Sequence, residues 1–259
     1  MSTTDTAAAI EYLPRADGHR IAHVTTPGRA PGVLFCGGFR SDMTGTKAGA
    51  LEAACREAGR AYTRFDYLGH GASSGAFTEG TIGRWADDAV AVLDRLAPAP
   101  CVVVGSSMGG WIMLLAALAR RRRVAGLVGI AAAPDFTETL MWERYDDEVR
   151  GILLSEGRYD EPSIYGEESY PVTLALIEEG RRHLLLGKPI PLTCPVRLLH
   201  GMRDEDVPWR HSLALVQALA GADVRACFIK DGDHRLSREE DLALICRTVL
   251  DLCERVGAG

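Results

Sequence analysis

The sequence predicts an α/β fold, with a mostly parallel central sheet of about eight strands, flanking helices and an inserted helical lid. Short apolar stretches of strand length alternate with longer amphipathic stretches of helical period along most of the 259 residues. Turns rich in glycine and proline separate these stretches. The alternation is interrupted once, over residues 134–190, where charged and aromatic residues are more frequent. We therefore expect a core domain, formed by 1–133 and 191–259, and a lid at 134–190.

The N-terminal half is expected to begin with a hairpin. Residues 8–13 and 19–25 have the composition of two short strands, and Asp17-Gly18 between them is a turn signal. Farther on, fully apolar stretches indicate buried parallel strands, whereas residues 82–97 repeat apolar side chains at helical spacing. Glycines and prolines mark where these elements end. The expected strands are 32–36, 61–66, 101–104 and 124–130, and the expected helices are 45–59, 82–97 and 109–120.

The C-terminal half is expected to hold the lid and then resume the sheet. Helical stretches near 138–156 and 172–186 flank a loop rich in Pro, Gly, Ser, Glu and Tyr. A lid of this kind can shape a pocket and exclude water. The apolar stretch 196–200 then resumes the strand pattern, and the last helix carries one apolar face. The remaining expected elements are a helix over 208–220, a strand over 223–229, a loop over 230–234 and a helix over 238–255.

Composition and charge exclude several classes of protein. A hydrophobic share of 47% and a charged share of 25% are ordinary for a globular chain and exclude a disordered or collagen-like one. The net charge of −6 argues against nucleic acid and anionic membrane surfaces as partners. The longest apolar run, Trp111–Ala119, is far shorter than the ~20 residues of a membrane-spanning helix, so we expect no stable membrane insertion. The sequence does not indicate an oligomeric state.

Cysteine usage favours a reducing compartment. The seven cysteines are odd in number, and no two are spaced as C-x-x-C, so neither a disulfide scaffold nor a zinc site is indicated. Several lie in or beside apolar strand-like segments, where cysteine behaves as a small hydrophobic residue. The first residues have neither the basic region nor the apolar region of a signal peptide. These features predict a cytoplasmic protein without a bound metal.

The strongest chemical motif is Gly105-Ser106-Ser107-Met108-Gly109, which has the form G-x-S-x-G. It lies between an apolar strand and an apolar helix, which is the context of a nucleophile elbow. The turn from strand to helix is so sharp that side chains two positions before and after the serine would clash. Gly105 and Gly109 remove both clashes. We therefore expect Ser107 to be an exposed nucleophile at the sheet edge.

A serine nucleophile needs a base and an orienting carboxylate, expected in the order serine, acid, histidine. His234 follows the last strand and is the expected base. His200 and His211 also follow the serine or lie near the candidate acids, but His211 is expected to be helical and exposed. His70 could border the pocket. For the acid, Asp204 is preferred over Asp206. Asp206 stands just before Val207-Pro208, where it could instead cap the next helix.

An oxyanion formed at this site needs two preorganised N–H donors. One is expected from the backbone of Met108, directly after the nucleophile. The other is expected from Phe39, because Gly37-Gly38 lets the backbone after the strand 32–36 approach closely.

Five segments carry a resemblance to a known family. They are GVLFCGGFRSDMTGTKA (32–48), RFDYLGHGASSG (64–75), VGSSMGGWIMLLAA (104–117), CPVRLLHGMRDEDVPW (194–209) and GDHR (232–235). In these segments the chain resembles the serine hydrolases of the α/β-hydrolase fold. Over HLLLGKPIPLTCPVRLLHGMRDEDVPW (183–209) it is most similar to the family of the mitochondrial palmitoyl-protein thioesterase, also described as a mycophenolic acid acyl-glucuronide esterase. The resemblance implies an α/β-hydrolase fold and places nucleophile, acid and base on Ser107, Asp204 and His234.

The predicted function is that of a serine-dependent carboxylic ester hydrolase, an esterase or thioesterase that acts through an acyl-enzyme on small or acyl-chain esters. No cofactor is needed for this chemistry, and the expected partner is a small-molecule ester or thioester. Two alternatives stay open. The same triad can serve a C–C bond hydrolase or a perhydrolase, and a member of the fold can bind a ligand without catalysis.

Overall fold

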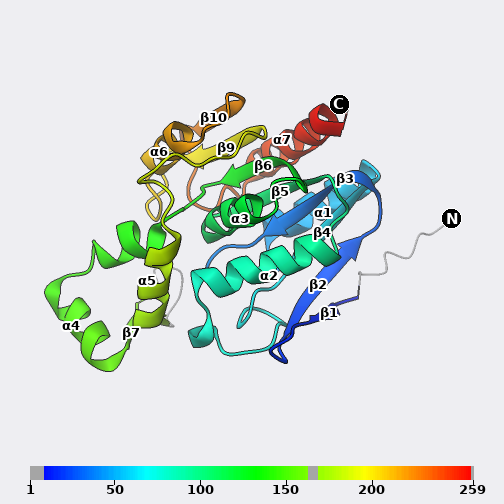
Figure 1. Ribbon diagram of the computed structural model, residues 1–259. Helices are drawn as coiled ribbons and strands as arrows, with labels where there is room; N and C mark the ends of the chain where they lie inside the picture. Colours follow the sequence, from blue (N-terminus) through cyan, green and yellow to red (C-terminus); the bar gives the residue numbers. More distant parts are fainter. Residues whose placement is uncertain (1–8, 163–168, 258–259) are drawn as a thin grey trace.

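The computed structural model describes residues 9–162 and 169–257 and contains an eight-stranded central sheet (Figure 1). The strand order is β1-β2-β4-β3-β5-β6-β9-β10. Strand β2 is antiparallel to both neighbours, and all other pairings in this sheet are parallel. The predicted fold class, with about eight mostly parallel strands flanked by helices, is therefore confirmed. The strands are β1 (Glu11–Pro14), β2 (Arg20–Thr26), β3 (Arg29–Cys36), β4 (Arg60–Phe65), β5 (Cys101–Ser106), β6 (Val124–Ile130), β9 (Val196–Gly201) and β10 (Val224–Ile229).

Helices cover both faces of the sheet and divide the core into two layers. Along β5, Cys101 and Val103 pack into the layer under α2 and α3, whereas Val102 and Val104 pack into the layer under α1 and α7. This alternation follows from the two-residue period of a strand and explains why a strand buried on both faces is apolar throughout. The helices are α1 (Thr46–Glu57), α2 (Ile82–Arg95), α3 (Met108–Ala119), α6 (Arg210–Ala218) and α7 (Glu239–Gly257), and a 3₁₀ turn, η1, spans Phe77–Glu79.

The segment between β6 and β9 differs from the two long helices expected there, and in Figure 1 it projects to the left of the sheet. The first expected helix is interrupted, because the Asp146 side chain accepts a hydrogen bond from Val149 N–H (2.9 Å) and starts a new helix. The second expected helix begins as a strand. Pro171 cannot lie in the interior of a helix, and Thr173 caps the helix that starts at Leu174. The elements are η2 (a π-helix, Thr137–Trp142), α4 (Asp147–Glu156), β7 (Arg158–Glu161), β8 (Tyr170–Thr173), α5 (Leu174–Gly180) and η3 (Arg181–His183).

Two expected features extend beyond the described residues. Residue 8 of the predicted hairpin and residues 163–168 of the predicted lid loop lie outside them, as does most of the N-terminal stretch on which the cytoplasmic prediction partly rested. The division of the chain into core and lid stays a prediction. Within the described ranges, no helix is long and apolar enough to cross a membrane. Each of the seven cysteines is a free thiol.

Candidate active site

Ser107 occupies a strained turn between β5 and α3. Its φ of 54° and ψ of −121° are rarely adopted by a residue other than glycine. Hydrogen bonds from the neighbouring strand and helix hold this conformation: Ser107 N–H donates to Ile130 O (2.9 Å), and Ser107 O accepts from Gly110 N–H (2.8 Å) and Ala133 N–H (3.1 Å). The turn thus keeps the hydroxyl at the carboxyl end of β5, where the adjacent parallel strands also end.

The glycines of the motif stand where no side chain fits. A Cβ atom on Gly105 would overlap the carbonyl oxygen of Gly109, and one on Gly109 would overlap that of Cys36. A third position, Gly110, was not singled out from the sequence, although a Cβ there would overlap the Cβ of Ala132. The Gly109-Gly110 pair at the start of an otherwise apolar helix was the available signal.

The structure brings Ser107, His234 and Asp204 into one hydrogen-bonded series. His234 Nε2 lies 3.2 Å from Ser107 Oγ, and His234 Nδ1 lies 2.8 Å from Asp204 Oδ2. A carboxylate only accepts, so Nδ1–H donates to Asp204 and leaves the lone pair of Nε2 facing the serine hydroxyl. His234 follows β10 and Asp204 follows β9, so both reach the serine from the carboxyl ends of strands.

Asp204 is held ionised by its hydrogen bonds. Its carboxylate is buried, and burial raises the pKa of the group, but hydrogen bonds from His200, His234 and Val207 N–H outweigh burial and lower the pKa to about 2. Oδ1 accepts from Asp206 N–H (3.0 Å) and Val207 N–H (2.8 Å). The carboxylate is therefore negative at neutral pH and is fixed in orientation at both oxygens.

Two expectations about the acid loop and the other histidines need correction. The N-cap of α6 is Trp209, and no side chain caps this helix, so the proposed capping role of Asp206 was wrong. The carboxylate that binds backbone N–H groups in this loop is that of Asp204, which accepts from Asp206 and Val207. His211, expected to be exposed, is half-buried, with Nε2 2.8 Å from Pro134 O.

The predicted oxyanion donors lie beside the serine. A Cβ atom built on Gly38 would lie 3.5 Å from Ser107 Cβ, which places the turn after β3 directly against Ser107. Among the described residues, neither Phe39 N–H nor Met108 N–H donates to another protein group. Two N–H groups without a protein acceptor beside a serine hydroxyl are suited to a negatively charged oxygen.

His70 lies behind this turn rather than in the position of the base. Its Nε2 accepts from Arg40 N–H (3.3 Å), and its Nδ1 lies 3.2 Å from Leu68 O. Burial lowers the pKa of His70 to about 4, so the ring is neutral at physiological pH and its Nε2 can accept. Arg40 has a φ of 57°, and His70 therefore contacts a strained residue next to Phe39.

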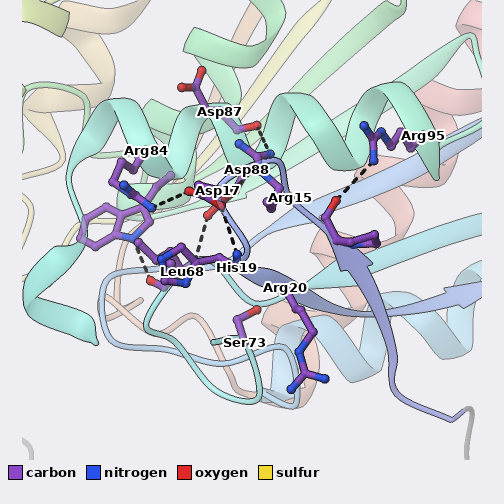
Figure 2. A network of polar contacts seen from close by, with 12 residues as sticks. Arg15, Asp17, His19, Arg20, Leu68, Ser73, Arg84, Asp87, Asp88 and Arg95 are labelled. Atoms are coloured by element: carbon purple, nitrogen blue, oxygen red, sulfur yellow. Dashed lines mark hydrogen bonds and ion pairs between the residues drawn. The ribbon is translucent and has the colours of Figure 1, made fainter. Parts of the chain in front are cut away.

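Helix α2 anchors the loop that carries His70. Leu68 N–H donates to Asp88 Oδ2 (2.9 Å), and Trp85 Nε1–H donates to Leu68 O (3.1 Å). Figure 2 shows Asp88 with Leu68 on one side and Arg15 of the N-terminal hairpin on the other, at an N–O distance of 3.6 Å. Burial raises the pKa of Asp88 to about 6, against the opposing effects of Leu68 N–H and Arg15.

A cleft of about 1010 Å³ opens over Ser107 and His234 and has a mixed apolar and polar lining. The π-helix η2 contributes apolar side chains to it, and π-helical turns are frequent at functional sites. Charged and hydroxyl side chains come from several elements, including α1, the loops after β3 and β9, and the segment between β6 and β9. The apolar lining includes Phe39, Phe136, Leu140, Met141 and Val207, and the charged and hydroxyl lining includes Arg40, Asp42, Thr46, Lys47, Arg144, Glu161, Tyr170, Glu205, Asp206, Arg235 and Ser237.

One group of side chains has metal-ligand spacing. Within the parts of the chain that are described, only Asp204, Asp206 and His234 bring three potential ligand atoms within 4.8 Å of one another. Both nitrogens of His234 already have partners, Asp204 and Ser107. Two of the three groups therefore already contact one another, and His234 also contacts Ser107.

Comparison with known proteins now decides the family. Residues 33–176 match the family model described as alpha/beta hydrolase fold. The chain belongs to this family. It is 40% identical over 250 residues to the mitochondrial palmitoyl-protein thioesterase ABHD10 of Mus musculus, across 96% of this chain and 84% of the relative.

Solved structures give the same result. The structure of mouse alpha/beta hydrolase domain-containing protein 10 superposes with a TM-score of 0.89 at 39% identity, covering 96% of this chain and 100% of that one. A putative hydrolase from Agrobacterium vitis S4 reaches a TM-score of 0.91 at 40% identity with the same coverage. The predicted family resemblance is confirmed, and the chain is a hydrolase by family.

The expected cytoplasmic location is contradicted by these relatives. The curated proteins that are 39–40% identical to this chain are named as mitochondrial. The expectation rested on the unpaired cysteines and on first residues that lack the features of a signal peptide. Free thiols indicate a reducing environment, and they cannot distinguish one reducing compartment of the cell from another.

Proposed function

We propose that this protein is a serine hydrolase that cleaves carboxylic esters or thioesters through an acyl-enzyme. The observation that carries the proposal is the continuous series of hydrogen-bonding distances from Ser107 Oγ through His234 to Asp204. A serine hydroxyl beside a neutral imidazole, itself oriented by a buried carboxylate, has the arrangement of an activated nucleophile.

In the first half of the reaction, Ser107 Oγ attacks the carbonyl carbon of the substrate while His234 Nε2 takes the hydroxyl proton. Asp204 stabilises the imidazolium that forms, because its carboxylate is ionised and accepts a hydrogen bond from Nδ1–H. The N–H groups of Phe39 and Met108 hold the oxyanion of the tetrahedral intermediate, and each such donor contributes about 10²–10³ in kcat at comparable sites. His234 then protonates the departing alcohol or thiol.

In the second half, water replaces the departed group and the same residues act again. His234 takes a proton from water, and the hydroxide attacks the acyl carbonyl on Ser107. The second tetrahedral intermediate collapses to the carboxylic acid, and Ser107 regains its proton from His234. No step needs a group beyond this chain and water.

The mixed lining of the cleft supports an assignment of substrate parts. The apolar side chains suit an acyl chain, and the charged and hydroxyl side chains suit an alcohol or thiol portion with polar substituents. The relatives named palmitoyl-protein thioesterase support a fatty acyl thioester as one substrate class. The segment 134–190 would act as the lid, because η2 supplies Leu140 and Met141 to the cleft.

Hydrolysis of p-nitrophenyl esters from acetate to palmitate, and of palmitoyl-coenzyme A as a thioester, tests the proposal. Ser107→Ala is the inactive comparison, and Ser106→Ala is the matched control, because Ser106 is the adjacent buried serine. We expect turnover by the wild type and by Ser106→Ala and none above background by Ser107→Ala. Folded wild-type protein that hydrolyses none of these substrates would contradict the proposal and would favour a C–C hydrolase, a perhydrolase or a ligand-binding protein.

A further inference from the structure

A second histidine contacts the same carboxylate oxygen of Asp204 that His234 contacts. His200 lies near the end of β9 and is completely buried. Its Nε2 lies 3.1 Å from Asp204 Oδ2 and 2.9 Å from Val207 O, and its Nδ1 lies 2.7 Å from Ser212 Oγ on α6. The proposed mechanism does not use this side chain.

The partners of His200 determine which nitrogen carries the proton. Both neighbours of Nε2, a carboxylate and a carbonyl oxygen, can only accept, so Nε2 must be the donor. In the neutral ring Nδ1 is then an acceptor, and Ser212 Oγ–H donates to it. Ser212 is itself buried, so water does not compete for this contact. A neutral ring with both nitrogens satisfied is the form that suits a fully buried site.

The donors around Asp204 leave its carboxylate little freedom to rotate. Oδ2 receives the N–H of His234 and shares the Nε2–H of His200 with Val207 O, whereas Oδ1 receives the backbone N–H groups of Asp206 and Val207. The side chain of Asp204 has no exposed surface, so no water is at hand to replace a lost donor. The direction of Oδ2, and with it the orientation of His234, therefore depends on His200 as well as on the backbone.

We propose that His200 is a positioning residue that holds the Asp204 carboxylate in the orientation required by His234, with Ser212 selecting the tautomer that can donate. The proposal rests on the function proposed above, because its effect on rate passes through Asp204 and His234. His200 does not line the cleft or contact Ser107, so a loss of His200 should act on the chemical step rather than on substrate binding.

Two substitutions of His200 separate hydrogen bonding from packing. His200→Leu removes the donor, whereas His200→Gln retains an amide N–H that can reach Asp204. We expect His200→Leu to lower kcat by about tenfold to a hundredfold with KM within about twofold of wild type, and His200→Gln to restore part of the loss. His23→Leu is the matched control, because His23 is also buried in a strand, β2, and contacts none of these residues. It should leave kcat unchanged.

A spectroscopic measurement on the free enzyme makes the test independent of turnover. The proton on His234 Nδ1 is hydrogen-bonded to the buried carboxylate of Asp204. It should give a low-field proton resonance in the wild type and in His23→Leu. We expect it to broaden or shift in His200→Leu. Ser212→Ala leaves the imidazole ring of His200 in place and removes only the hydroxyl that donates to it. It should give the same change to a smaller degree, and it replaces His200→Leu as the test if that variant does not fold.

The outcomes distinguish this proposal from the proposed function. Wild-type kcat in His200→Leu, or an unchanged resonance in both His200→Leu and Ser212→Ala, would overturn the positioning role. Equal losses in His200→Leu and His200→Gln, with the resonance unchanged, would assign His200 to packing and would also overturn it. If the wild type proved inactive on all esters, the proposed function would fail, and the resonance would still decide whether His200 orients Asp204.

Discussion

His234 Nδ1 lies 2.8 Å from Asp204 Oδ2, while Asp206, two residues farther along the same loop, contributes its backbone N–H to the same carboxylate. The two acidic residues therefore stand in different relations to the imidazole. Asp204 contacts His234 directly, and hydrogen bonds from four donors keep its carboxylate ionised against the effect of burial.

This difference predicts unequal effects of two identical substitutions. Asp204→Asn should lower kcat by about 10³–10⁴, because an amide can present N–H to His234 and select the wrong tautomer. Asp206→Asn should lower it by less than about tenfold. Steady-state kinetics on a p-nitrophenyl ester, with circular dichroism to verify folding, measures both. An equal or reversed order of the two losses would remove Asp204 from the role of the acid.

The nucleophile elbow predicts a large cost for one methyl group. Gly109→Ala should destabilise the protein by about 3 kcal/mol or more, because the new Cβ would overlap the carbonyl oxygen of Cys36. Gly49→Ala is the matched control in helix α1, where a Cβ meets no atom within 4 Å; it should stabilise by about 0.5–1 kcal/mol. Urea unfolding of the two variants measures both effects. Similar stability of the two variants would show that the close approach of α3 to β3 is not as described.

Asp88 predicts a pH-dependent stability. Its pKa of about 6 in the folded protein exceeds the value of about 3.9 in an unfolded chain, so the folded state binds this proton more tightly. As pH rises from 4 to 7, ionisation of Asp88 therefore destabilises the fold, by about 2–3 kcal/mol at most. Asp88→Asn does not ionise, and its stability relative to the wild type should increase over this range.

The control for this effect is Asp87→Asn, on the exposed side of the same helix. Its stability relative to the wild type should stay constant between pH 4 and pH 7. Urea unfolding at four or five pH values gives the comparison. A pH-independent difference between Asp88→Asn and the wild type would mean that the Asp88 carboxyl titrates normally in the fold.

The apolar side chains that line the cleft predict a change of chain-length preference. Leu140→Trp would fill space beside Met141 and Phe136, so long acyl chains should be excluded more than short ones. We expect the ratio of kcat/KM for octanoate to that for acetate to fall by about tenfold. Leu154→Trp, on α4 and 64% exposed outside the cleft, should leave the ratio unchanged. A fall in kcat/KM by the same factor for both esters would place the acyl chain elsewhere.

The core of the fold could be predicted because local and tertiary preferences agree there. The apolar stretch 101–104 has the composition of a buried strand and forms one in the sheet, and Gly105 and Gly109 indicate the sharp turn because they have no side chains. The segment 134–190 could not be predicted as well. Its helical spacing is real, but Asp146 and Pro171 interrupt it by local hydrogen bonding and ring geometry.

Chain order and strand ends predict that Ser107, Asp204 and His234 lie together, and their catalytic roles stay predictions. Ser107, Asp204 and His234 each follow a parallel strand, and the carboxyl ends of neighbouring strands lie together. The contacts of His200 with Ser212 and Asp204 could not be predicted, because they depend on how α6 packs beside β9. The position of His70 behind the oxyanion turn likewise depends on the side chains of α2, which hold its loop.

The most direct test of Ser107 as the nucleophile is the mass of the protein after the turnover of a p-nitrophenyl ester has been quenched. The account predicts a transient increase by the mass of one acyl group, located after digestion on the peptide that contains Ser107, and its absence in Ser107→Ala. An acyl group on a different residue, or the same adduct in Ser107→Ala, would contradict the account.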